Sequence, residues 1–338
     1  MIFQLKAPSF WYPKDDAGSV SFLQKCLKPV SSLYGSIAVS KINKKSQYTS
    51  KLPVICLGNV VAGGTGKTPC AIYIFKRAKE LGLAQNPCFL TRGYGGKYKH
   101  AVLVDPKKHS NEMVGDEALM LAEIGPIITS PDRVNGAKLA EELGYDMIIM
   151  DDGFQNPSLH KDINILVVDG RGFGNGHLLP AGPLREPVQN GLNRSDCVLF
   201  TDSPNVEALD TIHKAQKPSY SVTHLPASLD DYDLNRSYVA FAGIGNPEKF
   251  KTTLKMNGFN ITEFIDFGDH YQYSDLAAKK LIQKAIQNKA KLITTLKDYV
   301  RFPHQYRKHL NVLNIQLEVV EKNDFDAFLS SKINAKKS

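Results

Sequence analysis

Short apolar runs alternate with segments of helical periodicity from residue 53 onward. The apolar runs predict strands at 53–57, 87–91, 101–104, 127–129, 147–150, 163–168 and 197–201. Between several of them, apolar residues recur at helical spacing and predict helices at 69–81, 117–123 and 133–143. This alternation is typical of a mostly parallel, doubly wound α/β sheet, in which ligands bind at the carboxyl ends of the strands.

The pattern weakens after residue 202 and resumes near residue 237. Residues 203–236 are polar and contain several prolines and aspartates, so we interpret them as a connection between two domains. Further strands are predicted at 238–241, 261–266, 291–295 and 312–319. Helices are predicted from the turn at 243–247 to about residue 257, at 275–288 and at 325–333. We therefore expect four parts, at 1–50, 51–202, 203–236 and 237–338, the last being a smaller Rossmann-like α/β domain.

The first 50 residues form a region of their own. Residues 1–51 contain eight lysines and two aspartates, and the aromatic triplet 10–12 precedes a helical period at 19–42 that Pro29 should kink. The apolar positions of this period are Phe22, Leu23, Cys26, Leu27, Val30, Leu33, Tyr34, Ile37 and Ala38. An amphipathic helix lying in a membrane interface and a helix packed on its own domain both fit this pattern. Interspersed lysines and the lack of a small-residue cleavage site argue against a secretory signal.

Composition narrows the class of protein. The chain has 338 residues, of which 42% are hydrophobic and 22% charged, which suits two globular domains. Its five cysteines include no CxxC pair, so we expect neither a disulfide framework nor a zinc knuckle. We also expect the protein to work in a reducing compartment. The net charge of +8 permits acidic partners such as nucleotides, nucleic acid or anionic lipid. The sequence contains no run of 18 apolar residues, so we expect no strong membrane-spanning helix.

The segment GNVVAGGTGKTP at 58–69 joins the first predicted strand to the first predicted helix. Backbone N–H groups at the start of that helix would line an anion site, formed by Gly63, Gly64, Thr65, Gly66, Lys67 and Thr68. Lys67 would reach the outer phosphates of a nucleotide, and the Thr68 hydroxyl a magnesium ion. Val61 replaces the first glycine of the usual G-x-x-x-x-G-K-[ST] spacing. We nevertheless interpret the segment as a P-loop, because a glycine-rich connection that binds nothing does not explain Lys67 and Thr68 at the first helical turn.

Two further pairs of residues could act beside this loop. Asp151 and Asp152 follow the strand predicted at 147–150, as in a Walker B element that orders magnesium, although a simple turn would look the same. Arg185 and Glu186 lie in the segment NGHLLPAGPLREP at 175–187. The arginine could neutralise phosphoryl oxygens and the glutamate could bind a metal, or the two could form a surface salt bridge.

Asp116 and His270 are the candidates for proton transfer. Asp116 opens a predicted helix, where it is either an N-terminal capping residue or a base that accepts a proton from an attacking hydroxyl. His270 follows Asp269 after a predicted strand. It is either a structural histidine or one oriented by a carboxylate across a cleft. Sequence pattern leaves both choices open.

Taken together, these motifs resemble the tetraacyldisaccharide 4′-kinase family, the lipid A 4′-kinases of Gram-negative envelopes. The resemblance runs from about residue 11 to residue 302. It is carried by GNVVAGGTGKTP, RGYGG (92–96), GDE (115–117), PDR (131–133), DDGFQ (151–155), GHLLPAGPLREP (176–187), GIGNP (243–247), DH (269–270) and TLKDYVRF (295–302). The order of these motifs makes the resemblance specific.

The resemblance implies transfer of the γ-phosphoryl group of ATP, with Mg²⁺, to the 4′-hydroxyl of a tetraacylated disaccharide 1-phosphate at the cytoplasmic face of the inner membrane. It implies that Asp116 is the base and that His270 pairs with it. Family members often have a second histidine after this motif, where the present chain has Tyr271. The remaining implied roles are phosphate contacts for Lys67 and Arg185, metal binding for Thr68, Asp151, Asp152 and Glu186, and substrate binding for Arg92, Arg133 and Gln155.

Three other functions were weighed against this one. A regulatory NTPase of the partitioning or metal-chaperone kind usually has a lysine just before the paired glycines, where this chain has Ala62. A GTPase would have [NT]-K-x-D, whereas TLKD at 295–298 places the lysine differently. A nucleic-acid binder is suggested only by net charge, with no aromatic-rich basic motif, so we expect no nucleic-acid partner. We expect a monomer acting on a glycolipid at a membrane surface.

Overall fold

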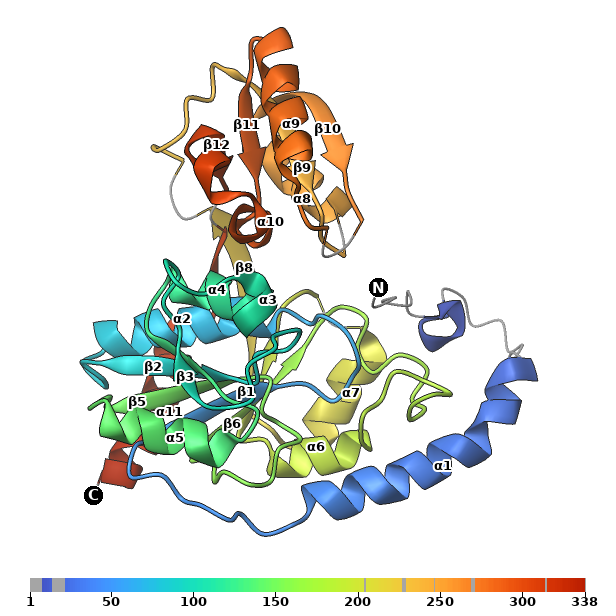
Figure 1. Ribbon diagram of the computed structural model, residues 1–338. Coiled ribbons are helices and arrows are strands. Elements are labelled where there is room, and N and C mark those ends of the chain that lie inside the picture. Colours follow the sequence, from blue (N-terminus) through green and yellow to red (C-terminus); the bar gives the residue numbers. More distant parts are fainter. Residues whose placement is uncertain are drawn as a thin grey trace.

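The computed structural model describes residues 8–13, 22–203, 205–226, 229–245, 247–268, 271–313 and 315–337. Its strands form two sheets, of nine and four strands. The large sheet forms the body of the molecule, and the small sheet with its helices lies to one side of it (Figure 1).

The large sheet is parallel at its centre. Its order is β13-β8-β7-β6-β1-β5-β2-β4-β3. Pairing is parallel except for β3 against β4 and β13 against β8. The strands are β1 (Val54–Gly58), β2 (Pro87–Thr91), β3 (Val102–Leu103), β4 (Ile127–Thr129), β5 (Met147–Asp151), β6 (Ile163–Val168), β7 (Cys197–Phe200), β8 (Ser219–Pro226) and β13 (Ile315–Val319). The predicted doubly wound, mostly parallel α/β architecture is confirmed.

Helices cover both faces of this sheet. One face packs against α2 (Lys67–Glu80), α4 (Asp116–Ala122) and α11 (Lys322–Lys337). The other face packs against α5 (Arg133–Glu142), α6 (Val188–Arg194) and α7 (Val206–Lys214). Alternate residues of each strand enter opposite cores, as Ile55 and Cys56 do in β1. Burial on both faces explains why these strands are continuous apolar runs in the sequence.

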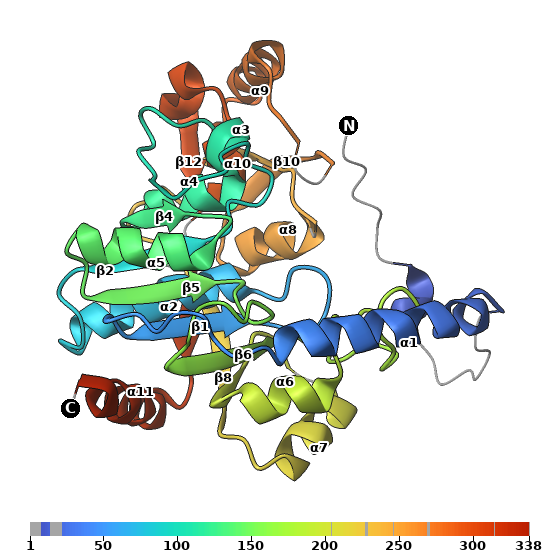
Figure 2. The same ribbon diagram turned by 60° about the horizontal axis from the view of Figure 1, so that its bottom comes forward.

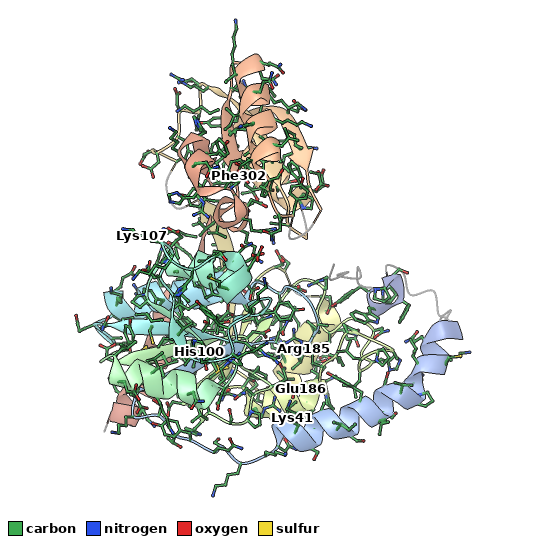
Figure 3. All side chains as sticks on the ribbon, in the orientation of Figure 1. Lys41, His100, Lys107, Arg185, Glu186 and Phe302 are labelled. Carbon is green, nitrogen blue, oxygen red and sulfur yellow. The ribbon has the colours of Figure 1, made fainter. Side chains whose placement is uncertain are left out.

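The small sheet is all parallel, in the order β10-β9-β11-β12. Its strands are β9 (Ser237–Ala242), β10 (Asn260–Asp266), β11 (Lys291–Thr294) and β12 (Leu310–Val312), and its helices are α8 (Pro247–Met256), α9 (Asp275–Gln287), α10 (Leu296–Arg301) and the 3₁₀ turn His304–His309. A core lies on each face, one of them built around Phe241 and Phe302 (Figure 3). We call this unit the second domain.

The prediction that residues 203–236 only connect two domains was wrong. This segment contains α7 and β8, and β8 pairs with β7 inside the large sheet. The segment buries residues in both cores of the large sheet, Ala208 and Ile212 from α7 and Tyr220 and Val222 from β8. The periodicity was missed because β8 lies near the edge of the sheet and half of its residues are polar.

The prediction of one strand at 312–319 and of a C-terminal domain reaching residue 338 was also wrong. The segment divides at residue 313 into β12 of the small sheet and β13 of the large sheet. The helix predicted at 325–333 is present as α11, but it buries Phe325, Leu329 and Ile333 against the large sheet and does not belong to the second domain. The chain therefore enters the second domain after β8 and returns through β13.

Helix α1 (Phe22–Ile42) runs past α6 and projects beyond the body of the large domain (Figures 1 and 2). It continues through Pro29. Its attachment is close, because a Cβ on Gly35 would lie 2.4 Å from Leu178 and the Ser31 hydroxyl accepts a hydrogen bond of 3.0 Å from the Ala181 N–H. In the described part of the chain, no helix combines the length and apolarity that crossing a bilayer requires.

Candidate active site

A cavity of about 3040 Å³ lies at the carboxyl ends of the central strands. The ends of β6, β1, β5 and β2, which are neighbours in the sheet, contribute Asp169, the phosphate loop, Asp151 and Arg92 to its lining. The second domain contributes residues 244–245 and 295–297 from the other side. The cavity is thus shared by both domains.

Side chains from distant segments hold the phosphate loop. Gly66 has φ of 83°, a left-handed conformation that favours glycine, and α2 begins at the next residue. The side chain of Asn59 donates a 3.0 Å hydrogen bond to the Thr65 hydroxyl, and the Thr201 hydroxyl donates one of 2.9 Å to the Thr65 carbonyl. A guanidinium N–H of Arg171 donates to the Gly64 carbonyl at 2.7 Å. The loop is therefore braced before any ligand binds.

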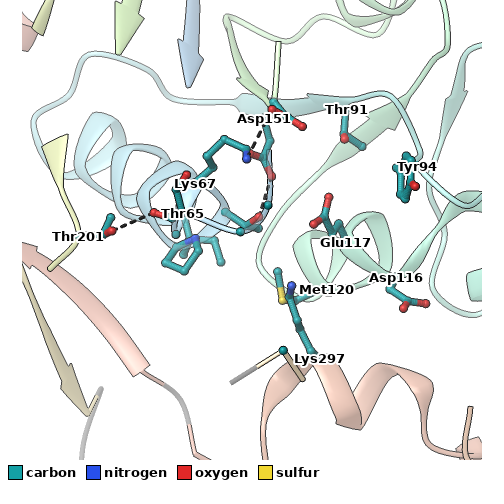
Figure 4. Close-up of a pocket in the computed structure, with 18 of the residues that line it drawn as sticks. Thr65, Lys67, Thr91, Tyr94, Asp116, Glu117, Met120, Asp151, Thr201 and Lys297 are labelled. Carbon is teal, nitrogen blue, oxygen red and sulfur yellow. Dashed lines mark hydrogen bonds and ion pairs between the residues drawn. The ribbon is translucent and has the colours of Figure 1, made fainter. Parts of the chain in front are cut away.

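Lys67 and Thr68 are paired with the two aspartates that end β5. The Thr68 hydroxyl donates a 2.9 Å hydrogen bond to Asp151 Oδ2. Lys67 Nζ lies 3.5 Å from Asp152 Oδ1, and Arg185 Nη1 lies 3.3 Å from the same oxygen. The structure therefore brings together the lysine, hydroxyl, carboxylates and arginine that the sequence predicted, and Figure 4 shows Lys67 beside Asp151 in the cavity.

The two aspartates differ in their electrostatics. Burial raises the pKa of the Asp151 carboxyl to about 7, with the Glu117 carboxylate adding to the rise and Lys67 opposing it. Burial acts in the same direction on Asp152, but Lys67 and Arg185 outweigh it and hold the pKa of that carboxyl below its usual range. The two adjacent carboxyls are thus shifted in opposite directions, and a cation placed between them would favour the ionised form of Asp151.

Magnesium fits this group of residues. Within the described ranges, no cluster of three or more His, Cys, Asp or Glu side chains is arranged to hold a metal. Mg²⁺ is, however, usually bound by one or two carboxylates together with substrate phosphates and water. Asp151 Oδ1 is buried without a hydrogen-bond partner among the described residues, and it lies on the carboxylate that accepts from the Thr68 hydroxyl. Thr68, Asp151 and Asp152 are therefore the candidate magnesium ligands.

Glu186, the fourth predicted metal ligand, does not line the cavity that holds the other three. The backbone of its segment pairs with the phosphate loop, since Arg185 N–H donates to the Val60 carbonyl at 2.7 Å. Arg185 then points into the cavity, whereas Glu186 has an exposed fraction of 0% and does not line it. Its carboxylate pairs with Arg194 at 2.7 Å and accepts a 2.9 Å hydrogen bond from Gln155. Neighbouring residues in this segment point to opposite sides, which the sequence did not reveal.

Asp116 is the first residue of α4 and faces the cavity, with Glu117 on its Lys67 side in Figure 4. Asn111 Nδ2 donates to Asp116 Oδ1 at 3.3 Å. From the second domain, Arg301 Nε lies 3.6 Å from Asp116 Oδ2. The Asp116 side chain lines the cavity between these two neighbours. The predicted partner His270 lies outside the described residues.

The three predicted substrate-binding residues line the same cavity. Arg133 is 3% exposed and donates to the Ser130 carbonyl at 2.7 Å, and burial lowers the pKa of its guanidinium to about 10. Gln155 donates to the Asn59 carbonyl at 2.6 Å as well as to Glu186. It therefore connects the loop that follows Asp151 and Asp152, which we call the aspartate loop, to the glycine-rich loop at 58–69. Arg92 lies at the end of β2, outside these networks.

The structure adds bracing residues that sequence reasoning missed. Thr201 and Arg171 each follow a strand of the large sheet, so the strand-end rule could have found them. Arg194 and Arg301 lie in helices and carry no local signal, because only folding brings them to Glu186 and Asp116.

Known proteins with this sequence and fold agree on one family. A family model described as Tetraacyldisaccharide-1-P 4′-kinase matches residues 23–334. Relatives named Tetraacyldisaccharide 4′-kinase include one from Rhodospirillum rubrum, 38% identical with 97% of this chain and 98% of the relative covered. Another, from Paramagnetospirillum magneticum, is 41% identical with 93% and 94% covered.

A solved structure extends the agreement to the fold. It is described as the "apo" form of LpxK from Aquifex aeolicus in complex with ATP, and it superimposes with a TM-score of 0.75 at 29% identity. The match covers 92% of this chain and 99% of the solved one. The sequence, the fold and the order of the motifs around the cavity lead to the same conclusion: the chain belongs to the tetraacyldisaccharide-1-P 4′-kinase family.

Proposed function

We propose that this protein transfers the γ-phosphoryl group of ATP to the 4′-hydroxyl of tetraacyldisaccharide 1-phosphate, the step of lipid A biosynthesis that forms lipid IVA. The observation that carries the proposal is the arrangement of Lys67, Thr68 and the aspartate pair on one wall of a cavity whose other wall presents Asp116. A nucleotide held by the first wall would direct its outer phosphate toward the second. This geometry suits direct in-line transfer to a bound hydroxyl.

The phosphate loop supports ATP binding through backbone N–H groups and the Lys67 ammonium. Lys67 and Arg185 both pair with Asp152, and either side chain could contact phosphoryl oxygens of bound ATP instead. Thr68, Asp151 and Asp152 would hold Mg²⁺, which when bound neutralises charge on the phosphate oxygens.

Asp116 is proposed as the base that accepts the proton of the 4′-hydroxyl. Its carboxylate faces the cavity and is held by Asn111 on one oxygen and Arg301 on the other. A correctly placed general base contributes about 10²–10⁴ in rate. His270 is proposed to pair with Asp116 from the second domain.

The substrate's sugar and phosphate would lie against Arg92, Arg133 and Gln155, and its acyl chains toward α1. Val30, Leu33 and Ile37 are 54%, 64% and 62% exposed, and they share one face of α1 at helical spacing. An exposed apolar stripe flanked by lysines favours a helix lying in a membrane interface. We therefore place the protein, as a monomer, peripherally on the cytoplasmic face of the inner membrane.

The decisive experiment supplies purified protein with Mg²⁺, γ-labelled ATP and the tetraacylated disaccharide 1-phosphate in detergent micelles. We expect label in the glycolipid, and loss of that label in Lys67→Ala. ATP hydrolysis without labelled glycolipid would refute the kinase assignment and favour the regulatory NTPase.

The membrane proposal has a separate test. The triple variant Val30→Ser, Leu33→Ser and Ile37→Ser should lose cosedimentation with anionic lipid vesicles, and it should also lose part of its activity on the acylated substrate, because the acyl chains are proposed to lie toward the same helix. The matched control changes the exposed apolar Val206 of α7, which is 82% exposed, to Ser. Equal vesicle binding by the triple variant and the control would show that α1 is not the membrane contact.

A further inference from the structure

Arg301 is a buried residue of the second domain that reaches the proposed base of the first. Its side chain is 1% exposed, although arginine is rarely buried unless it is paired. It is the last residue of α10, and its Nε lies 3.6 Å from Asp116 Oδ2 on α4. The motif TLKDYVRF contains this arginine, to which the family resemblance assigned no role.

Backbone carbonyls of the second domain fix the guanidinium. Arg301 Nη1 donates to the Gly243 carbonyl at 2.9 Å, and Nε donates to the Lys297 carbonyl at 3.0 Å. These carbonyls carry no formal charge, so they orient the guanidinium without neutralising it. The group is thereby presented rigidly at the domain boundary.

Asp298 is the nearest carboxylate in the same domain, and it is largely occupied by other donors. It accepts hydrogen bonds from the Gly243 N–H at 2.9 Å, the Tyr273 hydroxyl at 2.9 Å and the Thr295 hydroxyl at 2.6 Å. Arg301 Nη2 lies 3.6 Å from it and makes no hydrogen bond among the described residues. One guanidinium thus stands between two carboxylates, with Asp116 supplied by the other domain.

The distance between Arg301 and Asp116 depends on how the domains dock. Val300, the neighbour of Arg301, is 3% exposed and belongs to the hydrophobic core of the large domain. Leu296 and Tyr299 of the same helix also pack against that core. A second contact crosses the boundary nearby, where Asn111 donates to Gln272 at 2.7 Å and to Asp116 at 3.3 Å. Docking of α10 on α4 therefore places both neighbours of Asp116.

We propose that Arg301 is a positioning residue for Asp116, which it holds in the orientation needed for proton transfer only while the two domains are docked. This inference rests on the proposed role of Asp116 as base. Arg301 pairs with Oδ2 and Asn111 donates to Oδ1, so contacts on both oxygens restrict rotation of the carboxylate. Separation of the domains would withdraw the guanidinium and leave the base unrestrained.

A purely structural role for Arg301 would satisfy the same carbonyls, so the test must separate the two. We would measure kcat and the KM for ATP for Arg301→Gln, Arg301→Lys, Asp116→Ala and the double variant Asp116→Ala/Arg301→Gln, with thermal melting of each. Arg236→Gln is the control, because Arg236 belongs to the same domain and forms an exposed pair with Asp233.

If Arg301 acts through Asp116, Arg301→Gln lowers kcat about 10- to 100-fold with an unchanged KM for ATP, and Arg301→Lys recovers part of the loss. In the Asp116→Ala background the same substitution then changes kcat less than about threefold, because removal of the base removes what Arg301 positions. An equal fold-loss in both backgrounds, or an unchanged kcat in Arg301→Gln, would overturn the inference.

Two results would be read differently. Full turnover by Asp116→Ala would refute the proposed base itself, whatever Arg301 does. If Arg301→Gln does not fold, Arg301→Lys carries the same cycle, since a lysine keeps the positive charge but loses the paired contacts to the Gly243 and Lys297 carbonyls.

Discussion

Removal of Arg194 should destabilise the large domain strongly, because its partner Glu186 is fully buried. The Arg194 guanidinium lies 2.7 Å from Glu186 Oε2 and 5.1 Å from the centre of the Phe154 ring. The substitution Arg194→Ala leaves the Glu186 carboxylate with Gln155 as its remaining hydrogen-bond donor among the described residues. It also uncovers one face of a phenylalanine in the core beside the phosphate loop.

The magnitude follows from the burial of the carboxylate. Breaking a buried ion pair by removing one partner costs about 3–5 kcal/mol, because an uncompensated charge stays in the interior. With an m value of about 3 kcal/mol per molar urea, the unfolding midpoint should fall by roughly 1–1.7 M. The exposed pair Lys214–Asp210 provides the matched control, and Lys214→Ala should cost at most about 0.5 kcal/mol.

Urea unfolding followed by far-UV circular dichroism would measure both variants, with the transition of the large domain resolved from that of the second domain. A loss below about 1 kcal/mol for Arg194→Ala would refute the reasoning, since it would mean that Glu186 reaches solvent or is not ionised. A loss equal to that of Lys214→Ala would lead to the same conclusion.

Three further predictions use other features of the site. Glu186→Gln should leave the Mg²⁺ concentration for half-maximal activity unchanged, whereas Asp151→Asn should raise it at least about tenfold; a shift for Glu186→Gln would restore Glu186 as a ligand. Gly66→Ala should raise the KM for ATP, because φ at this position is 83° and the new Cβ would lie 3.0 Å from Thr201. Gly64→Ala is the control and should leave the KM unchanged, because its Cβ would meet nothing within 4 Å. Equal effects of the two substitutions would contradict this prediction. Burial raises the pKa of Glu141, but hydrogen bonds from Ser50, Tyr48 and Lys51 outweigh it and hold that pKa below 4.5. The unaltered protein should therefore be more stable than Glu141→Gln above pH 4.5, and this difference should disappear as the pH falls through the lower folded-state pKa. A stability difference that does not depend on pH would refute this prediction.

Most of the candidate site was predicted from the residues that follow the ends of predicted strands. The predicted strands at 87–91, 127–129 and 163–168 match β2, β4 and β6, because buried parallel strands are continuous apolar runs. Residues that directly follow such runs necessarily gather at one edge of the sheet. Lys67, Thr68 and the aspartates after β5 were found in this way, and the structure brings them within hydrogen-bonding or ion-pairing distance.

The errors share a physical cause. Residues 219–226 and 315–319 are short and half polar, and the second of them joins the large sheet only by pairing with the first, from which the second domain separates it in sequence. Glu186 and Arg185 are adjacent in sequence, yet one is buried and the other faces the cavity. Local pattern contains no information on either point.

Hydrophobic periodicity and the glycine-rich turn at 58–69 were thus sufficient to predict an α/β sheet with a glycine-rich loop between its first strand and first helix, because backbone geometry makes these features local. The packing of α10 on α4 and of α6 beneath the aspartate loop assigned partners to Asp116 and Glu186, because a buried charge is stabilised by whichever opposite charge the fold brings to it. Arg301 reaches Asp116 from the other domain and Arg194 reaches Glu186 from the next helix, so only the folded structure shows which charges are paired.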